Sequence, residues 1–142
     1  MPEKDLYKPM MEYLRTYCKP RGWKVWRNNT GRRGYVKFGK DGSPDFEMLT
    51  KPFACYYGIE VKTPEQLKKP NQGLSEKQIE WRDDVTDIGA GHFIVASLEM
   101  LKLVVEMEIQ AQVDDLQELY RDTMSESNVL AIGCLYRWPE FQ

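Results

Sequence analysis

The stretch Cys55-Tyr56-Tyr57-Gly58-Ile59-Glu60-Val61-Lys62 decides the fold, because its residues alternate in character with a period of two. That period is typical of a β-strand, in which successive side chains point to opposite faces. The odd-numbered residues, all apolar, then face a core or a helix. Glu60 and Lys62 lie side by side on the other face, where Gly58 leaves space. The preceding run 45–49 reads as a second strand, and the two strands are expected to form a hairpin.

Periodic and turn-rich segments on either side of this hairpin predict the other elements. Apolar residues recur at helical spacing over 3–17 and predict an amphipathic helix that ends before Pro20. Ser75 and Gln78 form a capping box that opens a helix over 75–88, and Ser97 caps a further helix over 98–120. Strands are expected at 23–28, 35–38, 93–96 and 128–138, with loops around Gly31 and over 63–73. This order predicts an α/β fold, a mixed β-sheet flanked by helices in one domain.

Length and composition exclude several classes of protein. The chain has 142 residues, 42% of them hydrophobic and 30% charged, which is typical of one globular domain. The longest uncharged apolar run, 93–98, is far shorter than the ~20 residues that a membrane span requires. No hydrophobic stretch follows the N-terminus, so a secretory signal is not expected. The three cysteines are widely spaced, which favours a reducing cytoplasm over a disulfide framework.

The net charge of −2 conceals a strong asymmetry along the chain. Residues 1–40 carry eleven Lys and Arg against three Asp and Glu, whereas residues 103–142 carry two against eight. Tyrosines and tryptophans are interleaved with the basic residues. Basic groups with interleaved aromatics suit a nucleic-acid backbone and unstacked bases. A solvated basic surface over a core of aromatics accounts for the same composition equally well.

Three familiar site patterns are present only in part. Gly34-x4-Gly39-Lys40 has the spacing of a P-loop, but Asp41 stands where Ser or Thr would bind magnesium, so no nucleotide cofactor is expected. The cysteines and His92 lack the spacing of a zinc site. A Ser-His-Asp triad would have to use His92, the single histidine, which is more typical of a structural role.

The acidic residues give a stronger signal. Pro44-Asp45 opens one strand of the hairpin, and Glu60-Val61-Lys62 ends the other. On adjoining strands the carboxylates of Asp45 and Glu60 would converge on one hard cation such as Mg²⁺. Lys62 would then orient a water molecule and offset charge on a phosphate. The alternative is an ordinary Glu-Lys pair on a half-exposed strand.

Three segments together resemble a known group of enzymes. Gly42-Ser43-Pro44-Asp45, Gly58-Ile59-Glu60-Val61-Lys62-Thr63 and Leu74-Ser75-x-x-Gln78 are similar to the motifs of the PD-(D/E)XK nuclease superfamily. Within it they resemble the VRR-NUC family of phage and bacterial nucleases. The helix that begins at Glu3 and the strand end Trp26-Arg27-Asn28-Asn29-Thr30-Gly31 also fit. The resemblance covers residues 3–102 and implies a restriction-endonuclease-like core over 1–102, with 103–142 as a C-terminal extension packed on the same domain.

The resemblance implies a role for each matched residue. Asp45, Glu60 and the backbone carbonyl of Val61 would bind Mg²⁺, for which Mn²⁺ is expected to substitute. Lys62 would be the catalytic lysine, and Gln78 would reach into the site. A capping box alone also accounts for a glutamine at position 78. The location implied is the cytoplasm of a bacterium, or of the host of a phage.

Nucleases of this type often use a carboxylate from the first helix, and Glu3 and Glu12 compete for that place. At 100° per residue, Glu3 lies on the apolar face of the helix and Glu12 lies nearly opposite. A carboxylate on a buried face requires a cation or a donor, which favours Glu3. Its position at the helix start is a second explanation, because the helix dipole favours an acid there.

The sequence therefore predicts a Mg²⁺-dependent endonuclease, a hydrolase that cleaves DNA phosphodiester bonds. Four basic residues are expected to bind the backbone, namely Arg27, Arg32, Arg33 and Lys37, and Lys68 and Lys69 are further candidates. Stand-alone members of the family resembled imply a homodimer that acts on branched DNA such as a four-way junction. The alternatives are a non-catalytic DNA-binding module, a sequence-specific restriction-type nuclease, and a scaffold whose acidic C-terminal third binds a partner.

Overall fold

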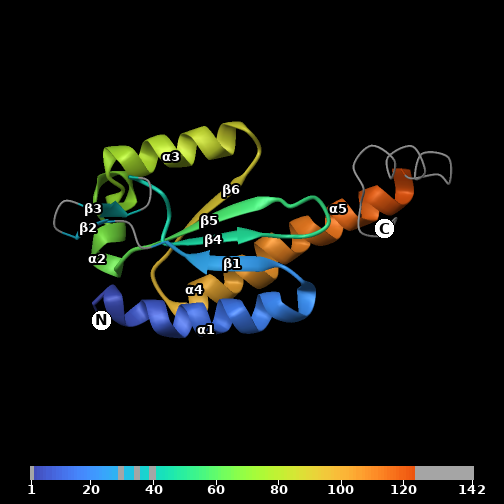
Figure 1. Cartoon of the computed structure of the whole chain (residues 1–142), viewed down its shortest axis with the longest axis horizontal. Helices are drawn as coiled ribbons and strands as arrows, with labels where there is room; N and C mark the ends of the chain where they lie inside the picture. Colours follow the sequence, from blue (N-terminus) through green and yellow to red (C-terminus); the bar gives the residue numbers. More distant parts are fainter. Residues whose placement is uncertain (1, 29–30, 34–35, 39–40, 124–142) are drawn as a thin grey trace.

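The computed structural model describes residues 2–28, 31–33, 36–38 and 41–123, and its centre is a four-stranded sheet (Figure 1). The strands are β1 (Lys24–Arg27), β4 (Phe46–Leu49), β5 (Tyr56–Val61) and β6 (Gly91–Val95), in the order β1-β4-β5-β6. β4 pairs antiparallel with both β1 and β5, whereas β5 and β6 are parallel. The predicted α/β fold with a mixed sheet is confirmed.

Helices cover both faces of the sheet (Figure 1). α3 (Glu76–Asp87) lies on one face, and α1 (Lys4–Arg21) and α4 (Leu98–Leu103) lie on the other. The predicted alternation of β5 is confirmed, because Tyr57, Ile59 and Val61 belong to the hydrophobic core. Glu60 and Lys62 are buried as well, with exposed fractions of 3% and 7%. The structure thus removes the interpretation of a half-exposed surface pair.

The first helix extends further than its sequence suggests. Pro20 lies inside α1, which ends only at Gly22, where the backbone adopts a left-handed φ of 70°. The Gly22 and Trp23 amides donate to the carbonyls of Lys19 and Cys18, and these bonds close the helix end. The glycine, rather than the proline, is therefore the stop signal.

The expected loop over 63–73 contains two short helices, so that expectation was wrong. α2 (Pro64–Leu67) begins at Thr63, whose side chain and backbone form a capping box with Gln66. The 3-10 helix η1 (Pro70–Gly73) follows directly. The capping residue, with proline at the first helical position, is a recognised helix start that the polarity of the segment conceals.

A second, two-stranded sheet pairs β2 (Gly31–Arg33) with β3 (Val36–Phe38) in antiparallel register. β2 occupies part of the expected loop around Gly31. The sequence did not predict this strand, because three residues are too few to show an alternating pattern. The strand expected at 128–138 lies outside the described residues.

A continuous helical segment follows β6. α4 leads into the π-helix η2 (Val104–Ile109) and then into α5 (Gln110–Thr123). Val105, Ile109 and Val113 are buried in the same core as the sheet. The boundary expected at residue 102 therefore falls within a helix that packs on the domain. Within the described ranges, no helix is both long and apolar enough to cross a membrane.

Candidate active site

The register of β4 and β5 brings the predicted acidic residues together. Phe46 pairs with Ile59, so Asp45, one residue earlier, lies at the level of Glu60. The Val61 amide donates to Asp45 Oδ2 over 2.7 Å. On the other side, the Asn28 amide donates to the Asp45 carbonyl over 2.8 Å. The Val61 bond thus fixes the Asp45 carboxylate, and the Asn28 bond fixes the Asp45 backbone, at the end of the hairpin.

A close approach between Pro44 and Gly58 fixes this end of the hairpin. Pro44 is fully buried, and a Cβ added at Gly58 would lie 2.8 Å from Pro44 Cγ. No side chain larger than hydrogen fits there without displacing the proline. The Asn28 side chain also donates to the Pro44 carbonyl, over 3.0 Å. Gly58 therefore allows Pro44 to pack closely, which helps to position Asp45, and it also leaves space beside Glu60.

Glu60 has one satisfied and one unsatisfied oxygen. Its Oε1 accepts a hydrogen bond from Gln78 Nε2 over 3.0 Å. Its Oε2 is buried and has no hydrogen-bond partner in the part of the chain that the structure describes. A buried carboxylate oxygen without a donor is costly unless a proton or a cation compensates it.

Burial raises the pKa of Glu60, and the charge of the neighbouring Asp45 raises it further, while Lys62 opposes both effects. Burial also raises the pKa of Asp45, against the hydrogen bond from the Val61 amide. Two carboxylates that approach each other away from water cannot both remain charged without compensation. The pair therefore holds a proton, or a cation that takes its place.

Gln78 joins the lysine to the acidic pair. Lys62 Nζ donates to Gln78 Oε1 over 3.2 Å, while the Gln78 amide group donates to Glu60. The same Oε1 accepts the Ser75 amide over 2.9 Å and completes the capping box of α3. The capping role and the site role, which the sequence leaves as alternatives, are both present in one side chain.

Glu3 and Glu12 lie in different surroundings. Tyr7 donates its hydroxyl proton to Glu3 Oε1 over 2.5 Å, and the same hydroxyl lies 3.1 Å from Asp45 Oδ1. Burial and the bond to Glu3 raise the pKa of Tyr7, so the hydroxyl stays protonated. Glu12 is exposed on α1. The structure thus connects Glu3, and not Glu12, to the predicted site, through a tyrosine.

The donor set fits a hard divalent cation. Carboxylate oxygens of Asp45 and Glu60 and the Val61 carbonyl are the ligand types that Mg²⁺ prefers, and Glu60 Oε2 is an oxygen that lacks a partner among the described residues. Across the same residues, no group of three or more His, Cys, Asp and Glu has the arrangement of a metal site. Glu3 therefore does not add a third carboxylate to the pair, and any metal would depend on two carboxylates, a carbonyl and water.

Among the described residues, His92 has no partner with which to form a triad. Burial lowers its pKa to about 4, so the ring is neutral at pH 7. Neither ring nitrogen has a hydrogen-bond partner in the described ranges. A histidine that acts as a general base requires a partner that orients its ring. The structural role expected for His92 therefore agrees with its surroundings better than a catalytic one.

The predicted DNA-binding residues fall into two groups. The Arg27 guanidinium lies 4.0 Å from the centre of the Tyr7 ring and so stands close to the site. The side chains of Arg32, Arg33 and Lys37, on β2 and β3, lie outside the described part of the chain. Lys68 and Lys69 are exposed between α2 and η1.

Sequence reasoning missed Tyr7 and Asn28. Tyr7 follows Leu6 on α1, and its role depends on contacts with Asp45, 38 positions away in the chain. Asn28 follows β1 and secures Pro44 and Asp45 across the sheet. Asn28 lies in the strand-end segment 26–31 that fits the resemblance, but no role was assigned to it, and nothing in the sequence points to Tyr7.

Comparison with known proteins shows a likeness to solved structures. A solved chain described as "VRR_NUC domain" is similar in structure, with a TM-score of 0.48 and 21% sequence identity. The alignment covers 70% of this chain and 94% of that chain. No family model matches the sequence, and no curated protein matches it.

Proposed function

We propose that the protein is a Mg²⁺-dependent endonuclease that hydrolyses DNA phosphodiester bonds at Asp45, Glu60 and Lys62. The observation that carries this proposal is the pair of adjacent carboxylates, half-buried Asp45 and buried Glu60, with Glu60 Oε2 unsatisfied among the described residues, next to the buried Lys62. A structural ion pair would bring Lys62 and Glu60 into direct contact. Here Gln78 lies between them and bonds to both. The Lys62 ammonium group can therefore still donate hydrogen bonds, and the Glu60 carboxylate can still accept them.

Asp45, Glu60 and the Val61 carbonyl would hold the metal ion. When bound, Mg²⁺ supplies Lewis-acid activation of a phosphate oxygen and lowers the pKa of a water molecule. The Val61 amide keeps the Asp45 carboxylate in place through its hydrogen bond. Because this bond comes from the backbone of β5, it positions the carboxylate before any substrate arrives.

Lys62 would orient the attacking water and offset charge that develops on the phosphate. An ammonium group has three donors, and one of them is directed at Gln78 Oε1. The remaining donors are available to a water molecule and to a phosphate oxygen. Gln78 keeps the lysine from pairing directly with Glu60, so that the ammonium charge acts on the phosphate.

DNA is the proposed substrate because basic residues flank the site on α1 and β1. Arg27 lies on β1 beside Tyr7, whose hydroxyl contacts Asp45. The motif resemblance extends the proposal to branched DNA and to a homodimer, which would provide two sites for the cleavage of two strands. A non-catalytic DNA-binding module is the alternative, but it requires neither the lysine nor the unsatisfied carboxylate.

A cleavage panel tests the proposal. Labelled linear duplex, flap and four-way-junction DNA are incubated with the full-length protein in Mg²⁺, in Mn²⁺ and in chelator. We expect cleavage with either metal, none in chelator, and the highest rate on the junction. Binding without cleavage of any substrate would support the non-catalytic module. Equal cleavage rates on linear, flap and junction substrates that contain the same sequence would support a restriction-type nuclease.

A further inference from the structure

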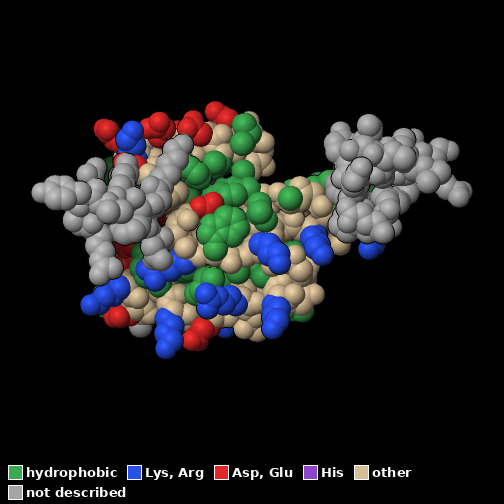
Figure 2. All heavy atoms as spheres, in the orientation of Figure 1, with side chains coloured by type: hydrophobic (Ala, Val, Ile, Leu, Met, Phe, Trp, Pro, Cys, Tyr) green, Lys and Arg blue, Asp and Glu red, His purple; other side chains and the backbone are tan. Residues whose placement is uncertain are grey.

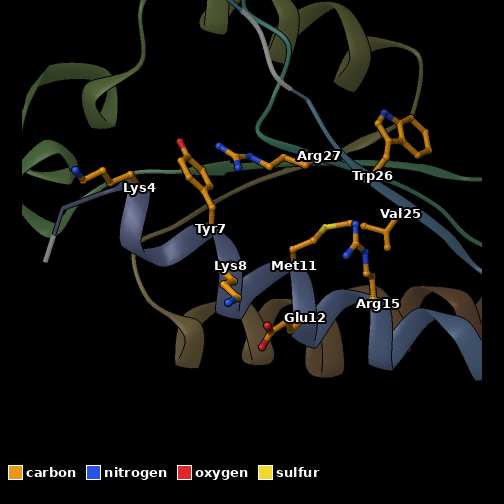
Figure 3. Close-up of a pocket in the computed structure, with 9 residues that line it drawn as sticks. All are labelled: Lys4, Tyr7, Lys8, Met11, Glu12, Arg15, Val25, Trp26 and Arg27. Atoms are coloured by element: carbon orange, nitrogen blue, oxygen red, sulfur yellow. The ribbon is translucent and has the colours of Figure 1, made fainter.

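A groove of about 610 Å³ runs between α1 and the edge strand β1 (Figure 3). α1 contributes one wall, and Val25, Trp26 and Arg27 contribute the other. Arg15 extends from the helix toward Val25, and Arg27 extends from the strand toward Tyr7 (Figure 3). Both guanidinium groups therefore lie where the helix and the strand meet.

The groove is strongly cationic. Four of its lining residues are basic and one is acidic, namely Lys4, Lys8, Arg15 and Arg27 against Glu12. Figure 2 shows Lys and Arg side chains gathered on the α1 side of the molecule, and acidic side chains along α3. Since α3 covers the opposite face of the sheet, the attraction for a polyanion is strongest on the α1 side.

One end of the groove reaches the candidate active site. The Arg27 guanidinium stacks on the ring of Tyr7, with 4.0 Å to the ring centre. The Tyr7 hydroxyl, at the edge of that ring, contacts Glu3 and Asp45. A chain of phosphates in the groove would therefore run toward Asp45.

Trp26 stands at the rim of the groove with 38% of its surface exposed. Side chains alternate along β1, so Trp26 points away from α1, while Val25 and Arg27 point toward it (Figure 3). An exposed indole beside a track of positive charge is the arrangement on which unpaired bases stack. In a duplex, the bases are already stacked on one another and cannot turn onto the indole.

We propose that this groove binds the phosphates of an unpaired DNA strand, and that Trp26 stacks on one of its bases. The inference rests on the proposed nuclease function and adds its substrate preference, an unpaired segment next to the cleavage site. The groove supplies affinity through charge, and Trp26 supplies the discrimination between unpaired and paired DNA.

Binding in chelator tests the inference without cleavage. The full-length protein is titrated against a fluorescent oligo-dT of about 16 nucleotides, and against a duplex of the same length, at several salt concentrations. The variants are Trp26→Ala, Trp26→Phe and Arg15→Gln, with Arg121→Gln on α5 as a matched exposed control. Thermal unfolding of each variant establishes that it is folded.

We expect Trp26→Ala to weaken oligo-dT binding by about fivefold or more and to change duplex binding by less than about twofold. Trp26→Phe should restore most of the affinity, because a phenyl ring also stacks. Arg15→Gln should lower the slope of log affinity against log salt by about 0.7 for each phosphate that the side chain no longer neutralises. Arg121→Gln should match the wild type.

Unchanged oligo-dT binding by Trp26→Ala, or an equal weakening on duplex DNA, would overturn the stacking site. An unchanged salt slope in Arg15→Gln would overturn the phosphate track. If the wild type cleaves DNA in Mg²⁺ while these variants bind as it does, the groove inference fails and the nuclease proposal stands. If the wild type neither binds nor cleaves DNA, both fail.

Discussion

Gln78 donates a hydrogen bond to Glu60 over 3.0 Å while its own carbonyl oxygen accepts one from Lys62 over 3.2 Å. A neutral amide therefore lies between a buried carboxylate and a buried ammonium group. The amide holds both charges in place without neutralising either. Its position is fixed in turn by the capping box at Ser75, so the start of α3 sets the geometry of the site.

The lysine should be required for chemistry rather than for binding. Lys62→Ala removes the ammonium group, so we expect DNA cleavage to fall below detection while DNA affinity stays within about twofold. Cleavage assays and binding titrations of the same preparation measure the two effects. Lys77→Ala, at an exposed lysine of α3 that pairs with Glu80, is the control and should cleave normally. Near wild-type cleavage by Lys62→Ala would make Lys62 a structural lysine.

Two variants separate the roles of Gln78. Ser75→Ala removes the side-chain cap of α3 and should lower the free energy of unfolding by about 1 kcal/mol. Cleavage should be retained, because the Ser75 backbone amide still donates to Gln78 Oε1. Gln78→Ala removes the cap bond and both of its bonds within the site, so it should also lower the cleavage rate by about 10–100-fold. Chemical denaturation and single-turnover cleavage give the two values. Equal cleavage by both variants would limit Gln78 to capping.

The two helix glutamates should differ sharply. Glu3→Gln weakens the acceptor of the Tyr7 hydroxyl bond, which then shifts toward Asp45, so cleavage or metal affinity should fall by about 10–100-fold. Glu12→Gln, at an exposed position, should change stability by no more than ~0.5 kcal/mol and leave cleavage unaltered. Tyr7→Phe should resemble Glu3→Gln if the hydroxyl transmits the effect. The opposite ranking of the two glutamates would contradict this connection.

Part of this arrangement was predictable from the sequence, and the reasons differ from residue to residue. The period of two along β5 placed Glu60 and Lys62 on one face, and Pro44-Asp45 before the partner strand supplied the second acid. The helical period of α1 placed Glu3 on the buried side. These are local patterns, which a sequence carries directly.

The remaining interactions depend on tertiary packing. Tyr7 contacts Asp45 only because α1 packs across the end of the hairpin. The sequence shows that Gly58 is small, but it does not show that Pro44, 14 positions away, packs against it. The sequence carries signals for the end of α1 at Gly22 and for the helix after Thr63. The prolines in both segments instead favoured an earlier helix end and a loop.

The effect of metal on stability should depend on pH. Burial raises the pKa values of Glu60 and Asp45 in the folded protein without metal, and the charge of Asp45 raises the pKa of Glu60 further. A group with a raised folded pKa contributes stability that is present at low pH and is lost as the pH rises through that pKa. Metal replaces the lost proton, so the increase in Tm on adding Mg²⁺ should grow between about pH 5 and pH 8.

Scanning calorimetry with and without Mg²⁺ at each pH measures this effect. Glu60→Gln is the control, because it keeps the shape of the side chain and removes the charge. Its Tm should respond weakly to Mg²⁺ and should not acquire the pH dependence of the wild type. An increase in Tm that is the same at every pH would show that the metal binds elsewhere.

The decisive test of a metal-dependent site is the cleavage rate as a function of Mg²⁺ concentration, for the wild type and Glu60→Gln purified in parallel. We expect the wild type to be inactive in chelator, to recover fully when Mg²⁺ is restored, and to saturate with metal. Glu60→Gln should be slower by at least about 100-fold, because it removes the charged ligand whose second oxygen is unsatisfied among the described residues. Full activity of the wild type in chelator, or equal rates for the two proteins, would contradict a metal-dependent site at Asp45 and Glu60.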